Sequence, residues 1–288
     1  MRGRTDLALE EKELWEKSAA ENTALRGVKA RTEERAGIVL TEVDILNDEG
    51  ARALQKPVGR YLTLELKPVS RHEPDGFRLA AEEVGRQAAM LLRGAENVLV
   101  AGLGNPDVTP DALGPETLKS LIVTRHLKRQ AGHIFDAFRT VSAVQPGVLG
   151  STGLESLELV RGAVRCVRPD AVVVVDALAA VNLSRVCSTV QLSSTGIIPG
   201  SGVGNSRAAF NEQTLGVPVI SVGVPTVMDA ETALSPEAAG GEGIPAGMIV
   251  TPRDIDQKVR EMGRMVGYGL DLALHRGLTV DSIACFLP

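Results

Sequence analysis

The chain has few aromatic residues and no excess of basic ones. Only 3% of its 288 residues are Phe, Trp or Tyr, and its formal net charge is −5. Proteins that bind single-stranded nucleic acid stack bases on aromatic side chains, and phosphate backbones attract basic surfaces. We therefore expect no direct nucleic-acid ligand. A mildly acidic protein can still attract a basic protein substrate.

Long apolar runs are absent as well. A membrane-spanning helix needs about 20 predominantly apolar residues, and the chain contains no run approaching that length. The N-terminal sequence MRGRTDLALEEKELWEK has no apolar core of the signal-peptide type. We expect a protein without a membrane segment, located in the cytoplasm.

Cysteine is scarce. The three cysteines, an odd number without CxxC spacing, favour free thiols in a reducing compartment over a disulfide framework or a zinc site. They are Cys166, Cys187 and Cys285.

What is present is an alternation of strand and helix patterns. The four consecutive valines of AVVVVDAL (171–178) predict a strand buried on both faces, as in the centre of a parallel sheet. VPVISVGVP (217–225) and the residues 98–101 predict two more strands, and 77–93 predicts a helix. The predicted fold class is α/β: an open, mostly parallel sheet flanked by helices.

We interpret residues 1–288 as one domain, with an α/β core at 95–288 and an N-terminal strand and helix elaboration at 1–94. Within the elaboration, residues 5 to about 30 are charged and helix-prone, and 37–45 and 61–66 resemble half-exposed strands. The core contains three further predictions. They are a helix at 115–127, a loop at 234–247, and a long C-terminal helix with Thr251 as N-cap and Pro252 in its first turn.

The turn GLGNPDVTPDALGP (102–115) begins like a nucleotide-binding loop. A dinucleotide site needs a third glycine so that the next helix can approach the pyrophosphate. Here Asn105, Pro106 and Asp107 follow Gly104, so an acid stands where an anion would bind. The turn therefore predicts no bound cofactor.

Two carboxylates stand near predicted strand ends. Asp111 follows the strand at 98–101, and Asp176 ends the valine-rich strand. Ligand sites in such sheets form at the carboxyl ends of strands, so the two side chains can face one crevice. The alternative is that each aspartate only caps the helix that follows it.

The stretch STGIIPGSGVGNSR (194–207) is the third candidate. Its alternating glycines can expose N–H groups to a developing oxyanion, or they can form an ordinary glycine-rich loop. Arg207 can bind substrate or be a solvated surface charge. The candidate substrate and oxyanion residues are Gly200, Gly202, Gly204, Asn205 and Arg207.

These blocks together resemble the germination protease family, the spore endopeptidases of endospore-forming bacteria. RTDLALE, GRYLTLE, VTRHL, PGVLGSTGLES, GVPVISVGVPTVMDA and MIVTPRDID also fit, in order, over nearly the whole chain. The resemblance implies an endopeptidase that degrades small acid-soluble spore proteins during germination, in the spore core. It also implies a fold like that of the hydrogenase-maturation endopeptidases. Members are described as tetramers, made as zymogens and activated by removal of an N-terminal segment.

The resemblance also assigns the site. The family's proposed catalytic pair is two aspartates, which match Asp111 in TPDALGP and Asp176 in DALAA. Two carboxylates at close range share one proton, so one member can activate water while the other protonates the scissile carbonyl. Since only Met1, Arg2 and Gly3 precede RTDLALE, we expect no large autoprocessing step.

Metal dependence is the main alternative, because the hydrogenase-maturation relatives use acidic residues and a histidine around a metal. None of the four histidines lies in a short ligand motif, and His126 of VTRHL falls on a predicted helix. Some family members carry a histidine where this chain has Ile198. We favour a hydrolase without metal or other cofactor over a metal-dependent endopeptidase that trims one specific protein. The retained aspartates argue against a catalytically inactive binding module.

Overall fold

A computed structural model describes residues 5–18, 25–204, 207–230 and 248–287. One sheet runs through the molecule in the order β1-β2-β3-β7-β8-β6-β4-β5, and β9 pairs with β8. The strands are β1 (Val28–Arg35), β2 (Ile38–Ile45), β3 (Gly59–Leu66), β4 (Asn97–Gly102), β5 (Thr140–Val144), β6 (Ala171–Ala180), β7 (Thr189–Ser193), β8 (Val219–Asp229) and β9 (Ile249–Val250).

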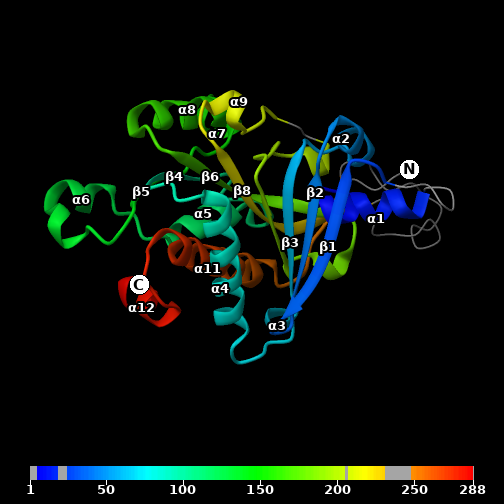
Figure 1. Cartoon of the computed structure of the whole chain (residues 1–288), viewed down its shortest axis with the longest axis horizontal. Helices are drawn as coiled ribbons and strands as arrows, with labels where there is room; N and C mark the ends of the chain where they lie inside the picture. The colour runs from blue at the N-terminus through cyan, green and yellow to red at the C-terminus, as the bar shows by residue number, and fades with distance from the viewer. Residues whose placement is uncertain (1–4, 19–24, 205–206, 231–247, 288) are drawn as a thin grey trace.

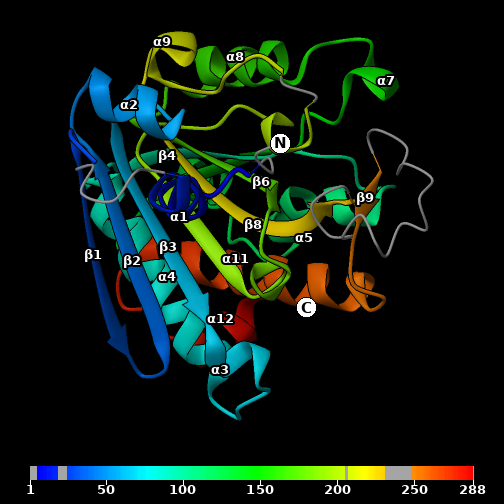
Figure 2. The same cartoon turned by 90° about the vertical axis from the view of Figure 1, so that its right-hand side faces the viewer.

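Helices cover both faces of this sheet. In Figure 2, α8 lies above the sheet and α11 below it. The helices are α1 (Ala8–Ser18), α2 (Asp48–Leu54), α3 (Lys67–Ser70), α4 (Gly76–Leu92), α5 (Leu113–Lys119), α6 (Arg125–Ala131), α7 (Leu149–Thr152), α8 (Ser156–Val167), α9 (Glu212–Leu215), α11 (Ile255–Leu274) and α12 (Val280–Phe286).

The core half of the sheet is parallel. β8, β6, β4 and β5 are neighbours that run in the same direction. The first six residues of β6 are all buried. Its odd-numbered valines pack with α4 and α11, and its even-numbered valines pack with α8. Burial on both faces explains the unbroken valine run and confirms the predicted fold class.

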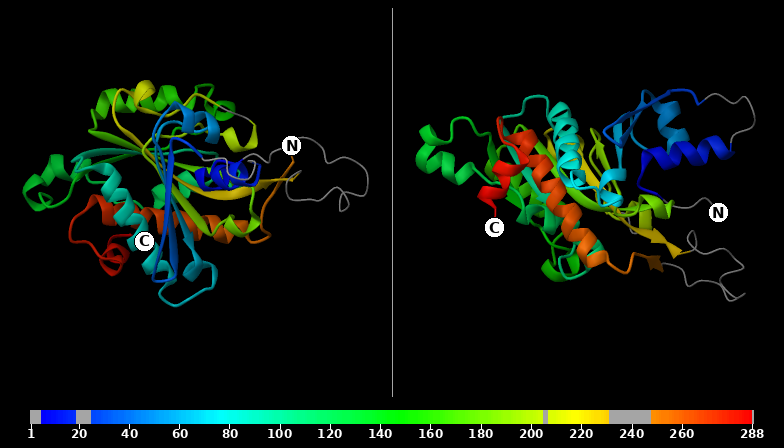
Figure 3. Two further views of the ribbon diagram at one scale, coloured as in Figure 1. Left: turned by 45° about the vertical axis from the view of Figure 1, so that its right-hand side comes forward. Right: turned by 90° about the horizontal axis from the view of Figure 1, so that it is seen from below.

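The N-terminal part adds an antiparallel extension, which makes the whole sheet mixed. β3 pairs with β7, and β1 and β2 follow outward. The strands predicted at 37–45 and 61–66 are confirmed as β2 and β3. Figure 3 shows α1 and α2 at one end of the molecule and α6 and α12 at the other.

The helix predicted from residue 5 to about 30 is wrong in its second half. α1 ends at Ser18 in the described part of the chain, and Val28 already belongs to β1. The sequence VKARTEER has no apolar alternation because β1 is an exposed edge strand. Main-chain pairing with β2, and the Arg31–Glu42 ion pair across the two strands, hold it in place.

Two helix predictions in the core also need correction. The helix predicted at 115–127 is divided into α5 and α6, because the N–H of Ile122 donates to the buried carboxylate of Asp271 instead of continuing a helix. The long C-terminal helix, α11, begins at Ile255 with Asp254 as N-cap. Thr251 instead donates its hydroxyl to the carbonyl of Thr226.

The loop predicted at 234–247 lies outside the described residues. Among the helices that the structure describes, none combines the length and the apolar character that crossing a bilayer requires.

Candidate active site

The turn after β4 positions Asp111. β4 ends at Gly102, and Gly104 follows with a φ of +104°. A Cβ at Gly104 would lie 1.8 Å from the carbonyl oxygen of Asp111, so only glycine lets the chain double back here. Gly114 likewise approaches the backbone of Leu103 and packs the start of α5 under the turn. The glycines of the motif therefore bring a short 3₁₀ turn, Thr109–Asp111, over the strand end.

Asp111 is half-buried and fixed by its own turn. Its Oδ2 atom accepts a hydrogen bond of 2.8 Å from the N–H of Asn105, and its own N–H donates to the carbonyl of Val108. Burial raises the pKa of Asp111, against the opposing effects of the Asn105 N–H and the positive charge of Arg207. Asp111 does not cap α5, whose N-cap residue is Ala112.

Asp176 lies inside β6, not at its end. β6 continues to Ala180 because it pairs with β8 over this whole length, with Asp176 opposite Gly223. The sequence-based position at the strand end is therefore wrong. The neighbouring strand β4 does stop one register position earlier, where Gly102 pairs with Val175. Because β4 is shorter, no β4 residue pairs with β6 at Asp176. Asp176 therefore does not cap a helix, which was the alternative interpretation of its position.

Asp176 is almost completely enclosed, with 4% of its surface exposed. Its Oδ1 atom accepts from the N–H of Ala177. Burial first, and then the negative charges of Asp111 and Asp6, raise the pKa of Asp176 well above 3.8. A carboxyl in this position holds its proton at pH values where an exposed aspartate has lost it.

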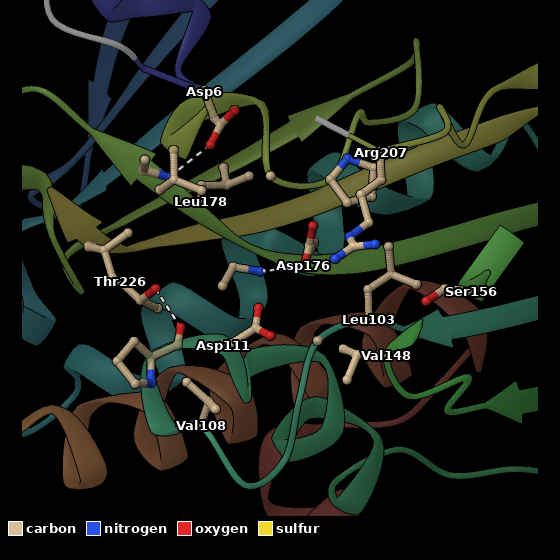
Figure 4. A pocket seen from close by; sticks show the side chains of 18 of the residues that line it. Asp6, Leu103, Val108, Asp111, Val148, Ser156, Asp176, Leu178, Arg207 and Thr226 are labelled. Carbon is tan, nitrogen blue, oxygen red and sulfur yellow. Dashed lines mark hydrogen bonds between the residues drawn. The ribbon is translucent and has the colours of Figure 1, made fainter. Parts of the chain in front are cut away.

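Asp111 and Asp176 line one cavity of about 310 Å³. Figure 4 shows both side chains, with that of Arg207, turned into it. The structure thus brings together the two aspartates that the sequence separates by the helices α5 to α8. The negative charge of Asp111 is one of the causes that raise the pKa of Asp176.

A third carboxylate, that of Asp6, lines the same cavity and was missed in the sequence. Its Oδ2 atom accepts from the N–H of Ala179 at 2.8 Å, and its Oδ1 atom accepts from the hydroxyl of Ser201 at 2.5 Å. The segment before α1 thereby links β6 to the glycine-rich loop. Asp6 stands in RTDLALE, a charged stretch without a local pattern that points to a site.

The glycine-rich loop forms one wall of the cavity. Gly200 and Arg207 line it, whereas Gly202 and Gly204 do not. Gly202 instead packs against Asp6: a Cβ there would lie 2.2 Å from the Asp6 carboxylate. The N–H of Gly204 donates to the carbonyl of Ser201 within the turn. Asn205 lies outside the described residues.

The rest of the cavity is largely apolar. Arg207 stands at its rim, 3.8 Å from a carboxylate oxygen of Glu155 and 39% exposed. The apolar lining includes Leu103, Val108, Val148, Leu149, Val203 and Ile249. An apolar wall beside two carboxyls fits a substrate with apolar side chains flanking the reacting bond.

Within residues 5–18, 25–204, 207–230 and 248–287, no group of three or more His, Cys, Asp or Glu residues is arranged to hold a metal ion. His126 is exposed on α6, and no histidine that the structure describes lines the cavity. The site's titratable groups are thus carboxyls and one guanidinium.

Fold and site together define an α/β protein whose candidate catalytic groups lie at the carboxyl end of one parallel strand, β4, and beside it within β6. Residues 5–238 match the family model described as "Peptidase_A25: Germination protease". The chain belongs to the germination protease family, as its motifs predicted, and is therefore a protease.

Curated relatives, each described as "Germination protease", agree with this assignment. The relative from Caldanaerobacter subterraneus subsp. tengcongensis is 39% identical, with 96% of this chain and 95% of the relative covered. That from Clostridium perfringens (strain 13 / Type A) is 38% identical, with 99% and 98% covered. That from Bacillus cytotoxicus is 42% identical, with 81% and 65% covered.

Among solved structures, the chain is similar to the [NiFe] hydrogenase maturation protease HycI from Thermococcus kodakarensis. The TM-score is 0.35 and the identity 14%, with 63% of this chain and 97% of that chain covered.

Proposed function

We propose that this protease is an endopeptidase that initiates the degradation of small acid-soluble spore proteins during germination, by an aspartate-dyad mechanism. The observation that carries the mechanism is the pair Asp111 and Asp176, which line one cavity, where the charge of Asp111 raises the pKa of Asp176. Membership of the germination protease family supports the proposed substrate class.

The environments of the two carboxyls support different roles. Asp176 is the more buried and faces two other carboxylates, so it holds the shared proton. Asp111 accepts an N–H hydrogen bond and lies near Arg207, so it carries the negative charge. Pairs of carboxyls in unlike environments divide acid and base roles in this way.

In the proposed reaction Asp111 removes a proton from water, and the water oxygen bonds to the scissile carbonyl carbon. Asp176 donates its proton to the carbonyl oxygen. Collapse of the tetrahedral intermediate then breaks the C–N bond, and the proton held by Asp111 passes to the leaving amine. Atoms and charges balance, and the dyad returns to one shared proton once the carbonyl proton goes back to Asp176.

Residues around the dyad have supporting roles in this proposal. The backbone of Gly200 faces the cavity, and Arg207 at the rim can bind a substrate carboxylate or carbonyl. Gly202 and Gly204 belong to the glycine-rich loop that carries Gly200. The enzyme acts in the cytoplasm of the spore core, as a homotetramer and without a cofactor.

The deciding experiment is incubation of the purified chain with a small acid-soluble spore protein, with and without a chelator. The proposal expects cleavage at internal bonds that chelation leaves unchanged. Asp107→Asn is a matched control, because Asp107 is exposed in the same turn. Loss of cleavage on chelation and its return with added metal would assign the carboxylates as ligands. Tight binding without cleavage would indicate an inactive binding module.

A further inference from the structure

A second recess lies at the opposite edge of the parallel sheet from the dyad. Asn97 and Thr140, the first residues of β4 and β5, form its floor, and α6 and the last turn of α8 form its walls. Its volume is about 540 Å³. The dyad lies beyond the carboxyl end of β4, so the two sites are separated by the length of a strand. Figure 1 shows α6 beside β5 at the outer end of the molecule.

Five cationic side chains line this recess. α6 contributes three of them and the end of α8 contributes two, although the chain as a whole is acidic, with a net charge of −5. They are Arg125, Lys128, Arg129, Arg165 and Arg168.

Most of these charges have no counter-charge in the described chain. Lys128 donates to the carbonyl of Phe138 at 2.6 Å, which satisfies one donor but neutralises nothing. None of the four arginines makes a side-chain hydrogen bond or ion pair with a described residue.

Two carboxylates beside Asn97 make other contacts. Asp170 accepts from the backbone N–H groups of Glu96 and Asn97, at 2.9 and 2.8 Å, and keeps its charge. The Glu96 carboxylate lies 3.8 Å from Arg139 and 3.9 Å from Arg276, neither of which lines the recess. Neither carboxylate forms an ion pair with a cation of the recess.

Convergence of like charges needs an explanation beyond local helix chemistry. Cations in the last turn of a helix interact favourably with its dipole, which accounts for Lys128, Arg129 and Arg165 but not for Arg125, the first residue of α6. The helix dipole does not explain why the cations of two helices line the same recess. Like charges that share a site destabilise the folded state, and a bound anion reverses the sign of that interaction.

We propose that this recess is a binding site for a small polyanion of the phosphate type. Four of the five cations are arginines, whose planar guanidinium groups bind phosphate oxygens in a bidentate manner. The volume suits a molecule from pyrophosphate to a nucleotide in size. The site is one open recess without aromatic side chains in its lining, so it lacks the stacking surfaces of a nucleic-acid groove.

Titration calorimetry at low ionic strength tests the site, with inorganic phosphate, pyrophosphate and ATP as separate ligands. Saturable binding of pyrophosphate at one site per chain is the expected result. Tighter binding of ATP than of pyrophosphate identifies a nucleotide as the source of the phosphate, and the reverse order identifies a free phosphate.

The test variant is Arg129→Gln with Arg165→Gln, one exposed position from each wall. Loss of one charge-assisted hydrogen bond weakens binding by about tenfold or more, so the pair should abolish detectable binding. The control, Arg253→Gln with Arg260→Gln, removes the same charge from exposed positions outside the recess and should bind pyrophosphate unchanged.

A second readout needs no ligand. Without an anion, the recess variant should have a higher Tm than the wild type at low salt, because two uncompensated charges are gone. Pyrophosphate should raise the Tm of the wild type and the control only. The proposal is overturned by equal affinity in variant and wild type, by the absence of saturable binding, or by duplex DNA that competes with pyrophosphate and binds more tightly.

Discussion

Asp176→Asn separates the catalytic role of this carboxyl from its structural one. The substitution keeps the size of the side chain and lets its oxygen still accept from the Ala177 N–H. It removes the ionisable proton from a group that is 4% exposed. Loss of a general acid or base typically slows a reaction by about 10²–10⁴, which adds about 2.7–5.5 kcal/mol to the barrier.

Stability should change in the opposite direction. The pKa of Asp176 is raised in the folded state, so the native protein binds this proton more tightly than the unfolded chain, whose value is near 3.8. The stabilising effect of the protonated Asp176 carboxyl is complete below the unfolded pKa. It is lost as pH rises through the folded pKa. Each unit of difference costs about 1.4 kcal/mol above both values. The asparagine variant avoids this cost, and about 1 kcal/mol raises the Tm of a protein this large by roughly 2 °C.

The assay pairs cleavage rate with Tm, both measured from pH 4 to pH 8. The advantage in Tm of Asp176→Asn over the wild type should grow with pH, while cleavage is nearly abolished throughout. Asp111→Asn should lose activity similarly, and the double variant should be little worse than either single one, because the dyad acts as a unit. Asp107→Asn should match the wild type in both measurements.

Two outcomes would refute this reasoning. Near-wild-type cleavage by either dyad variant would remove the acid–base pair from the mechanism. A Tm of Asp176→Asn below that of the wild type at pH 7, with an unchanged far-UV spectrum, would show that the buried carboxylate is stabilised by a partner that the proposed electrostatics omit.

Three further substitutions and one measurement of mass have expected outcomes. Asp6→Asn removes one of the negative charges that raise the pKa of Asp176, so the Asp176 limb of the kcat/KM–pH profile should move to lower pH; an unmoved profile contradicts this. Gly104→Ala places a methyl group against the Asp111 carbonyl at positive φ, which should lower stability by about 1–3 kcal/mol or more in denaturant unfolding and reduce cleavage. Arg185→Ala removes the partner of three carboxylates and should cost about 3–5 kcal/mol; a smaller loss in urea would mean that water replaces it. Light scattering should give the mass of a homotetramer, and a monomer at micromolar concentration would contradict the family-based expectation.

The sequence by itself predicted three of the four parallel strands, β4, β6 and β8, but not β5, and the family resemblance pointed to the aspartates. An unbroken run of valines is a local signature, because a strand buried on both faces needs apolar residues at every position. The glycines of the turn after β4 can also be interpreted from sequence. Each stands where the backbone approaches another segment closely or adopts a positive φ that is unfavourable for other residues. Motif matching then located Asp111 and Asp176 within these elements.

Tertiary structure decided what those elements do together. Asp176 lines the cavity because β4 stops beside it while β6 continues along β8. No local pattern encodes the length of a neighbouring strand. The same applies to the division between α5 and α6, which depends on a carboxylate in α11.

Asp6 and the basic recess are the clearest examples of features that the sequence alone does not predict. Asp6 reaches the cavity through hydrogen bonds to residues 173 and 195 positions away in the chain. The five cations of the recess come from two helices that only the sheet order brings together. Local sequence sets propensity and burial over a few residues, whereas the position of a charge relative to distant charges is fixed only when the strands pair.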